Sequence, residues 1–392
     1  MTTATPTTDT AEALLERVRA LLPIIEERAA DGDRDRSVPR EVIADLVSAG
    51  VARVLVPGRF GGLELGLDTW YELVREIAAV DMSTAWLASL ATHHPHYVAQ
   101  FPLAAQEEVW AEGPDVVIAA SIAPVCTIEP VEGGYKVTGR SPFTSGINNS
   151  DWAMVSGFVP GAGPAPDWRF FLLPASEYEV IDTWDVVGMR GTGSNTIVTE
   201  GVFVPEHRVL KYMDLIEGCG PGAQVSTNPL YALPFKSYSS LTFATPIVGA
   251  AKGVYDKFVE WTSKRVAAGG AAVRDFIGVR VKMSRAAADI DAADMLLRRI
   301  VATAMGPDRP TEADRARAMR DYSRAVELAI DAVDTLVALG GSAVFGSTHP
   351  IQRAWRDVHF AATHISLNPE TNYDHFGRIA LGMGRAPQNL SY

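Results

Sequence analysis

The chain has 392 residues, of which 47% are hydrophobic and 21% charged, and this composition is ordinary for a globular protein with a sizeable core. Its formal net charge of −12 argues against nucleic acid as a partner, because phosphate backbones are bound by basic surfaces. Two cysteines cannot form a disulfide framework, no apolar run reaches the roughly 18 residues of a membrane span, and no secretory signal opens the chain. We therefore expect a cytoplasmic protein that has no membrane partner.

The N-terminal part of the chain carries helical patterns. Apolar residues from Leu14 to Ile25 recur at helical spacing, which predicts a first helix. A second helix is expected between Ser37, a candidate N-cap, and Gly50. Two more are expected over residues 68–80 and 83–91.

The pattern changes twice along the rest of the chain. From Pro114, short segments rich in Val, Ile, Phe, Thr and Tyr alternate with Gly, Pro and Asn, which predicts an antiparallel β domain. From about Ser237, four long amphipathic segments predict a helix bundle. The order predicts an α+β fold with a helical domain at 1–113, a β domain at 114–225 and a four-helix bundle at 226–392.

Residues 188–196, GMRGTGSNT, form a glycine-rich stretch of the kind that can hold a phosphate. A dinucleotide fingerprint requires a third glycine where Thr196 stands, and a helix where β-branched residues follow. No G-K-[ST] closes a P-loop. The residues therefore predict a glycine-rich turn that leads into a strand.

The histidines give two further candidates. His93, His94 and His96 lie within four positions, but we expect no metal, because Pro95 interrupts a helix there and no carboxylate or thiol is near. A role as acid or base, or at a helix end, is favoured. His364 lies in an apolar run and is by default a core histidine. These patterns alone leave the activity open.

Five segments of the chain are informative when they are taken together and in order: STAWLASLATHHPHYVAQFPLAAQEEVW, GGYKVTGRSPFTSG, DTWDVVGMRGTGSNTIVTEGVFVPEHR, PIQRAWRD and HISLNPETNYDHFG. They resemble one family, the oxygenase components of two-component flavin-dependent monooxygenases built on the acyl-CoA dehydrogenase fold. That family includes hydroxylases of a phenolic secosteroid and of p-hydroxyphenylacetate. The resemblance runs in the same order from about residue 11 to the C-terminus.

The resemblance implies the same three-domain fold and a homotetramer assembled through the bundles. It also implies hydroxylation of a phenolic or polycyclic aromatic small molecule by molecular oxygen, through a C4a-hydroperoxyflavin. The cofactor would be reduced FMN, with FAD as the alternative, and a separate flavin reductase would supply it. The protein would contribute binding, orientation and ring activation.

The resemblance also implies roles for particular residues. Ser145 would lie near flavin N5 and C4a, His364 would take the phenol proton, and His94 would lie close to the active site. Arg265 would reach a flavin phosphate in a neighbouring subunit. The remaining expected flavin contacts are Ser121, Thr144, Arg190 and Thr192. The expected substrate pocket consists of Trp86, His94, Phe143, Asn148 and Tyr373.

The chain departs from the secosteroid hydroxylases on the substrate side of the expected pocket. They carry aromatic residues at the positions of Ser141 and Phe143, and an Asp-His pair where Asn148 and Asn149 stand here. Loss of one bulky ring and of an ionisable pair reshapes the pocket. We therefore do not assign the secosteroid as the substrate.

Three other functions stay open. An N- or S-oxygenase would use the same fold and cofactor. An FAD-dependent acyl-CoA dehydrogenase would need a catalytic glutamate, but Pro369 stands at the usual place and Glu370 one position later. A helical scaffold without a cofactor is disfavoured, because the resemblance retains four expected site residues together: Ser145, Thr192, Arg265 and His364.

Overall fold

The structure is a computed structural model, which describes residues 10–161 and 166–385. Its first part is helical, as the apolar spacing predicts. The pairs α1 with α3 and α3 with α4 pack together, and their buried faces form one continuous core. The helices are α1 (Ala11–Asp35), α2 (Arg40–Ser48), α3 (Leu67–Ala78), α4 (Met82–Val98) and α5 (Leu103–Val109).

Helix α4 corrects one prediction, because it continues through Pro95 to Val98 instead of ending near residue 91. Proline removes one backbone donor and normally breaks a helix interior. Here nearly every side chain of α4 is buried, so tertiary packing on all sides outweighs the lost hydrogen bond. The histidines therefore lie on a core helix and not in a loop.

The middle of the chain forms an eight-stranded sheet with the order β6-β7-β3-β2-β4-β5-β8, and β1 pairs with β4 beside this path. Most pairings are antiparallel, as predicted, but β1 and β2 both run parallel to β4, so the sheet is mixed. The strands are β1 (Ile118–Ala120), β2 (Cys126–Val131), β3 (Gly134–Thr144), β4 (Trp152–Val159), β5 (Asp167–Pro174), β6 (Glu179–Ile181), β7 (Asn195–Pro205) and β8 (Val209–Lys211).

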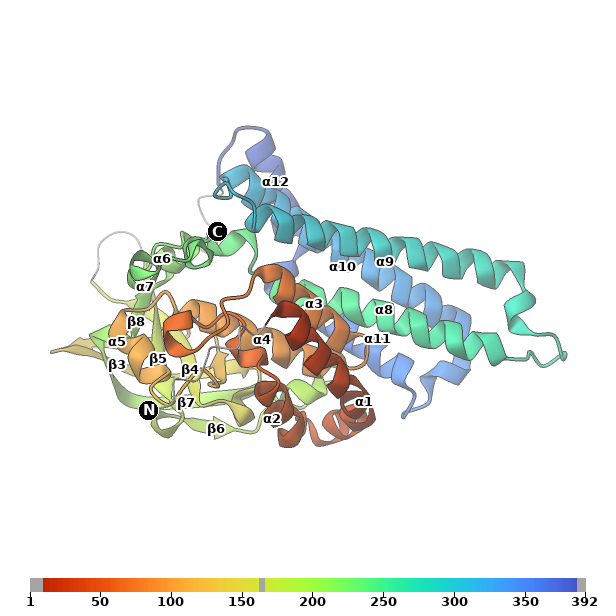
Figure 1. The fold of residues 1–392 in the computed structure, drawn as a ribbon, viewed down its shortest axis with the longest axis horizontal. Helices are drawn as coiled ribbons and strands as arrows, with labels where there is room; N and C mark the ends of the chain where they lie inside the picture. Colours follow the sequence, from red (N-terminus) through yellow and green to blue (C-terminus); the bar gives the residue numbers. More distant parts are fainter. Residues whose placement is uncertain (1–9, 162–165, 386–392) are drawn as a thin grey trace.

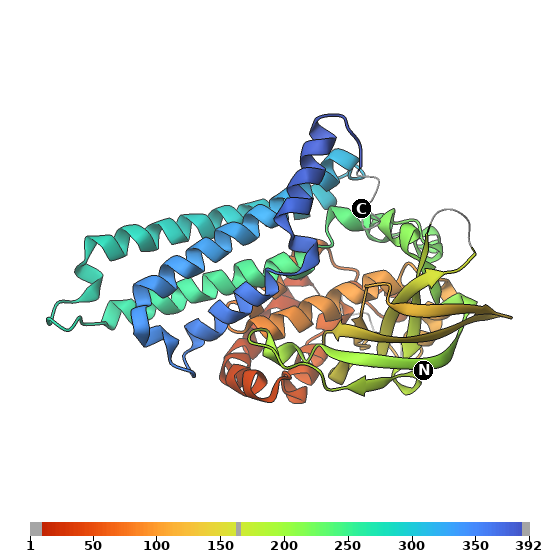
Figure 2. The same cartoon turned by 180° about the vertical axis from the view of Figure 1, so that it is seen from behind.

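The C-terminal part is a helix bundle that extends away from the sheet, with α1–α4 lying between the two (Figures 1 and 2). After the short α6 (Tyr212–Ile216) and α7 (Pro221–Val225), its helices are α8 (Leu241–Lys264), α9 (Ile277–Ala304), α10 (Glu312–Gly340), α11 (Pro350–Ala361) and α12 (Pro369–Ala380). The fourth predicted segment therefore ends at Ala361, and a fifth helix follows it. His364 lies in the break between α11 and α12.

One stretch of the described residues, Glu312–Phe345, is long and apolar enough to cross a membrane by length and composition. It contains α10, which packs against α8, α9 and α12. The apolar face of α10 is thus used inside the bundle, as expected for a core helix.

Helices α3 and α8 approach closely at a glycine. A Cβ on Gly253 would overlap the carbonyl of Ala79 at the end of α3. We therefore expect Gly253→Ala to lower the free energy of unfolding by about 1–3 kcal/mol, since backbone cannot move aside as a flexible side chain can. Urea unfolding followed by circular dichroism measures this. Gly278→Ala in α9, where a Cβ meets nothing within 4 Å, is the matched control, and equal destabilisation by both would contradict the packing argument.

Candidate active site

The end of β3 and the glycine-rich stretch lie side by side. Strands β3 and β7 pair so that Thr144 faces Asn195, with a bulge between Ser141 and Thr144. Just beyond this pair, Gly146 N donates to the Thr192 carbonyl at 2.9 Å. The predicted turn of residues 188–196 contains a 3-10 turn, η5 (Arg190–Thr192), and does lead into a strand.

Three hydroxyls form a row across this junction. Ser145 Oγ lies 2.7 Å from Ser194 Oγ, which lies 2.7 Å from Thr192 Oγ1. Thr192 Oγ1 in turn donates to the Met189 carbonyl at 2.8 Å. Ser194 was not singled out from the sequence, although its place two residues after Thr192 in the glycine-rich stretch was the available signal.

Phe143 presents an aromatic ring to solvent beside this row. The residue is 68% exposed, and its φ of 58° is strained for a residue that has a Cβ. Its ring packs at right angles to Trp184, with the centroids 5.9 Å apart. A strained backbone that holds an apolar ring outward is typical of a ligand site.

Two predicted flavin contacts hold the bulge of β3. Ser121 Oγ donates to the Pro142 carbonyl at 2.9 Å, and Thr144 Oγ1 donates to the Ser141 carbonyl at 3.0 Å. Both hydroxyl protons are thereby used by backbone. The two side chains fix the conformation from which Ser145 projects.

Asn148 is hydrogen-bonded to the start of β7, beside the end of β3. Its Oδ1 accepts from Asn195 Nδ2 at 3.1 Å, and Asn195 Oδ1 accepts from the backbone N of Trp184 at 3.1 Å. Asn148 is exposed at the edge of the Ser145 loop.

Arg190, one of the two predicted flavin-binding arginines, forms hydrogen bonds with residues of its own chain. The Arg190 guanidinium donates to the carbonyls of Asp33 and Val186, at 2.8 Å each, and to the Asp185 carboxylate at 3.3 Å. It ties the end of α1 to the glycine-rich stretch. This arrangement gives Arg190 a structural role, and its predicted contact with flavin stays a prediction.

Arg265 does not join the Ser145 site within one chain. It follows the last residue of α8, and the turn from α8 to α9 lies at the end of the bundle farthest from the sheet (Figure 1). Its guanidinium lies over the Trp261 ring, 4.4 Å from the centroid, and donates to the Leu339 carbonyl at 3.2 Å. A contact with flavin would require a neighbouring subunit.

His364 forms an aromatic cluster with two other residues. Its ring stacks on Phe243, with the centroids 3.7 Å apart, and meets the edge of Trp86 at 6.0 Å. Trp86 and Phe243 are 5.0 Å apart. His364 is the N-cap of the 3-10 turn η11 (Ile365–Leu367), Trp86 lies on α4 and Phe243 lies on α8. Phe243 was missed, because it lies in an apolar first turn that carries no motif.

The surroundings of His364 determine its protonation. The backbone N of Ser366 donates to Nδ1 at 3.2 Å, so a neutral ring carries its proton on Nε2. Burial, helped by nearby Lys236, lowers the pKa of His364 to about 4. The ring is therefore neutral near pH 7 and offers an N–H donor. To act as a base, the ring would have to take a proton on Nδ1, or move its own proton to Nδ1 so that Nε2 becomes free. Either change would break the hydrogen bond from the Ser366 amide.

The other histidines have separate partners. His94 Nδ1 lies 2.5 Å from the Ile118 carbonyl, which can only accept, and burial lowers the pKa of His94 to about 4. His96 bonds the Leu230 carbonyl and the Tyr238 hydroxyl. Within residues 10–161 and 166–385 no three His, Cys, Asp or Glu side chains are grouped so that they could hold a metal ion.

Tyr373 lies on α12, and its hydroxyl donates to Glu327 on α10 at 2.8 Å. Burial and this carboxylate raise the pKa of Tyr373 to about 12. No interaction in the described part of the chain joins Tyr373 to the cluster of His364, Trp86 and Phe243, so its predicted place in the substrate pocket stays a prediction. Glu370, one turn earlier, is exposed in the first turn of α12.

Helix α4 connects the hydroxyl row to the aromatic cluster. Leu87 packs beside Gly146, within 3.1 Å of the place where a Cβ would stand. The preceding residue, Trp86, faces Phe243 and His364. Helix α11 makes a second connection, because Phe360 packs on Trp184 at 5.6 Å, four residues before His364. Helices α4 and α11 therefore contact residues on both sides, beside the hydroxyl row and in or near the aromatic cluster.

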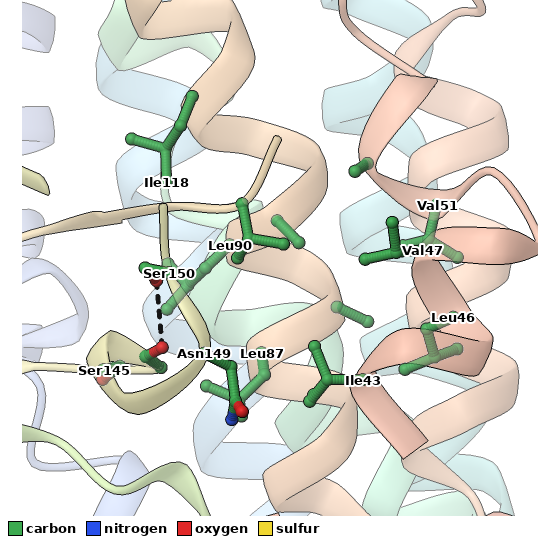
Figure 3. A pocket seen from close by; sticks show the side chains of 15 residues that line it. Ile43, Leu46, Val47, Val51, Leu87, Leu90, Ile118, Ser145, Asn149 and Ser150 are labelled. Carbon is green, nitrogen blue, oxygen red and sulfur yellow. Dashed lines mark hydrogen bonds between the residues drawn. The ribbon is translucent and has the colours of Figure 1, made fainter. Parts of the chain in front are cut away.

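A narrow cavity lies against the loop that carries Ser145 (Figure 3). Its volume of about 20 Å³ holds roughly one water-sized molecule and is too small for an aromatic ring. Ser150, on its wall, donates to the Gly146 carbonyl at 2.9 Å. The walls are mostly apolar and consist of Ile43, Leu46, Val47, Val51, Ala52, Leu87, Ala88, Leu90, Ala91, Val117, Ile118, Ser145, Gly146, Asn149 and Ser150.

Asp357 couples the glycine-rich stretch to pH. It is buried on α11 and accepts from Met189 N at 2.5 Å, and burial raises its pKa to about 7 in spite of this hydrogen bond and of nearby Arg356. The folded state then binds a proton more tightly than the unfolded state, so stability falls as pH rises from about 4 to about 7. In Asp357→Asn we expect this fall to be smaller by an amount on the order of 1–4 kcal/mol. Urea unfolding from pH 5 to pH 8 tests this, and parallel profiles for the two proteins would contradict it.

Comparison with known proteins places the chain in a family. Residues 8–113 match the family model for the acyl-CoA dehydrogenase N-terminal domain, and residues 241–369 match that for the C-terminal domain. The flavin-dependent monooxygenase oxygenase subunit HsaA of Rhodococcus jostii (strain RHA1) is 38% identical over 376 residues, which cover 94% of this chain and 98% of the relative. The chain belongs to the acyl-CoA dehydrogenase family. Within the family it is an oxygenase subunit of a flavin-dependent monooxygenase.

Two further relatives support the assignment of this chain as a monooxygenase subunit. The oxygenase component of an FADH2-dependent resorcinol hydroxylase from Rhizobium sp. (strain MTP-10005) is 34% identical, with 94% of each chain covered. The crystal structure of the 3-HSA hydroxylase from Rhodococcus sp. RHA1 superposes with a TM-score of 0.91 at 36% identity, covering 95% of this chain and 98% of the other. The predicted fold class and the predicted enzyme class are both confirmed.

Proposed function

We propose that this monooxygenase hydroxylates a small phenolic or polycyclic aromatic molecule, using molecular oxygen and reduced flavin from a separate flavin reductase. The observation that carries the proposal is the aromatic cluster of His364, Trp86 and Phe243, which includes a residue of α4, the helix that also packs against the Ser145 loop at Gly146. The aromatic substrates in the names of the relatives support it. A homotetramer and a cytoplasmic location are part of the same proposal.

The junction of β3 and β7 fits a flavin. A planar heterocycle with polar edges needs a flat apolar neighbour and hydrogen-bonding groups on one side. Phe143 offers an outward ring and Ser145 a half-buried hydroxyl, two positions apart on one turn. Ser121, Thr144 and Thr192 support that turn, and Arg265 of a neighbouring subunit would hold the phosphate. When bound, reduced flavin supplies the electrons that activate oxygen.

His364 would act on the substrate as a neutral donor. Its Nε2–H can donate to the oxygen of a phenol that has released its proton to solvent, and so stabilise the phenolate form, whose ring has a higher electron density. Stacking on Phe243 fixes the orientation of the imidazole, and the cap bond from Ser366 fixes its tautomer. This modifies the role expected from the resemblance, in which His364 takes the phenol proton itself.

The identity of the flavin is the finer part of the proposal. The resemblance favours reduced FMN, whereas the resorcinol hydroxylase relative is named for FADH2. Both flavins therefore belong in the test.

The test is anaerobic titration of the protein with reduced FMN and with reduced FAD, followed by rapid mixing with oxygenated buffer. We expect tight binding of one reduced flavin and a delay before the oxidised flavin spectrum returns, compared with free reduced flavin. Failure to bind either flavin, or return of the oxidised spectrum without delay, would contradict the proposal. Bleaching of bound oxidised FAD by an acyl-CoA thioester would favour a dehydrogenase instead.

A further inference from the structure

The protons of the hydroxyl row can be assigned from the acceptor at its inner end. The Met189 carbonyl can only accept, so Thr192 donates its one hydroxyl proton there. The 2.7 Å contact between Thr192 and Ser194 then requires Ser194 to donate. The 2.7 Å contact between Ser194 and Ser145 requires Ser145 to donate in the same direction. Every proton in the row therefore points inward, away from the surface.

The surrounding structure prevents the row from reversing. Met189 is fixed on both sides, because its N–H donates to Asp357 and its carbonyl also accepts from Trp184 Nε1 at 3.0 Å. Thr192 and Ser194 are 2% and 3% exposed, so water does not compete for their hydroxyls. Ser145 is only half-buried. Its outward side thus presents oxygen lone pairs and no proton.

We infer that Ser194 and Thr192 are positioning residues that make Ser145 a hydrogen-bond acceptor toward the bound cofactor, so that the site selects reduced over oxidised flavin. The inference rests on the proposed function and on the role that the family resemblance implies for Ser145, whose hydroxyl would lie near flavin N5. Reduced flavin carries an N–H at N5, whereas oxidised flavin has a bare nitrogen with a lone pair. An acceptor at Ser145 bonds the first and is repelled by the second.

The experiment measures the dissociation constants of the reduced and the oxidised flavin, under anaerobic and aerobic conditions respectively, with FMN and FAD as probes. In Ser194→Ala, the Ser145 proton is released and can turn outward to N5 of oxidised flavin. We expect the ratio of the oxidised to the reduced dissociation constant to fall by about 3- to 10-fold. Thr192→Val should change the ratio in the same direction, because it frees the proton of Ser194 to point at Ser145.

Two variants are controls. Ser194→Thr keeps the hydroxyl and should restore the wild-type ratio, which a merely structural role of the side chain would not explain. Ser150→Ala removes a neighbouring hydroxyl that bonds only the Gly146 carbonyl in the described structure, and it should leave the ratio unchanged. Near-ultraviolet circular dichroism of each variant reports whether the fold is intact.

The outcomes separate this inference from the proposed function. If the wild-type protein binds neither flavin, the proposed function fails. If the wild-type protein binds reduced flavin but well-folded Ser194→Ala and Thr192→Val keep the wild-type ratio, the row does not set the preference and the inference is overturned. If Ser150→Ala lowers the ratio as much as Ser194→Ala, the effect is not specific to the row, and the inference is likewise overturned.

Discussion

Replacing His364 by alanine is expected to lower the rate of aromatic hydroxylation by about 10- to 100-fold while reduced flavin still binds. The physical reason is the loss of the Nε2–H donor that would stabilise the phenolate form of the substrate. Product formation from phenolic probes such as resorcinol, together with the dissociation constant of reduced flavin, measures both effects. A phenol that is already ionised at the assay pH should be less affected than one with a high pKa.

His364→Asn is the matched variant, because His364 also caps η11 through the Ser366 amide. Asparagine is a good N-cap, so the break between α11 and α12 should keep its shape. If His364→Asn loses hydroxylation as His364→Ala does, the imidazole acts on the substrate. Full activity in His364→Asn would mean that the histidine acts only as the N-cap of η11, and it would refute the proposed role as a hydrogen-bond donor to the substrate.

Replacing Ser145 by alanine is expected to shorten the delay between oxygen mixing and the return of oxidised flavin by about 10-fold. Ser145 is the outermost member of the hydroxyl row and the one that is not fully buried. Without it, an N–H facing the row loses its acceptor and the cofactor is held less firmly against water. Stopped-flow absorbance measures the delay without any substrate, and hydrogen peroxide release should rise as hydroxylation falls.

Ser150→Ala again serves as the control, since Ser150 lines the same cavity but donates to the Gly146 carbonyl. It should leave the delay close to that of the wild-type protein. Equal shortening in the two variants would mean that the loop as a whole, and not the Ser145 hydroxyl, protects the bound cofactor.

Local patterns were sufficient for much of the fold. The apolar spacing of α1 and of the bundle helices predicted helices, and the β-branched segments separated by Gly and Pro predicted the sheet. These signals are local, because the spacing of apolar residues within each segment shows which of its side chains are buried. Two local signals misled: Pro95 suggested a helix end where the core imposed a continuous helix, and the run to Leu367 hid the break at His364.

The sequence by itself determined the class of protein, because residue order across almost the whole chain matches one family, and it predicted roles for Ser145, Thr192 and His364. Only the tertiary structure decided which contacts these side chains make. The direction of the hydroxyl row depends on the Met189 carbonyl, and the tautomer of His364 depends on the Ser366 amide. Phe243 joins the cluster across more than a hundred positions of chain from its partners. Such contacts are set by the packing of distant elements, which no local pattern of residue types records.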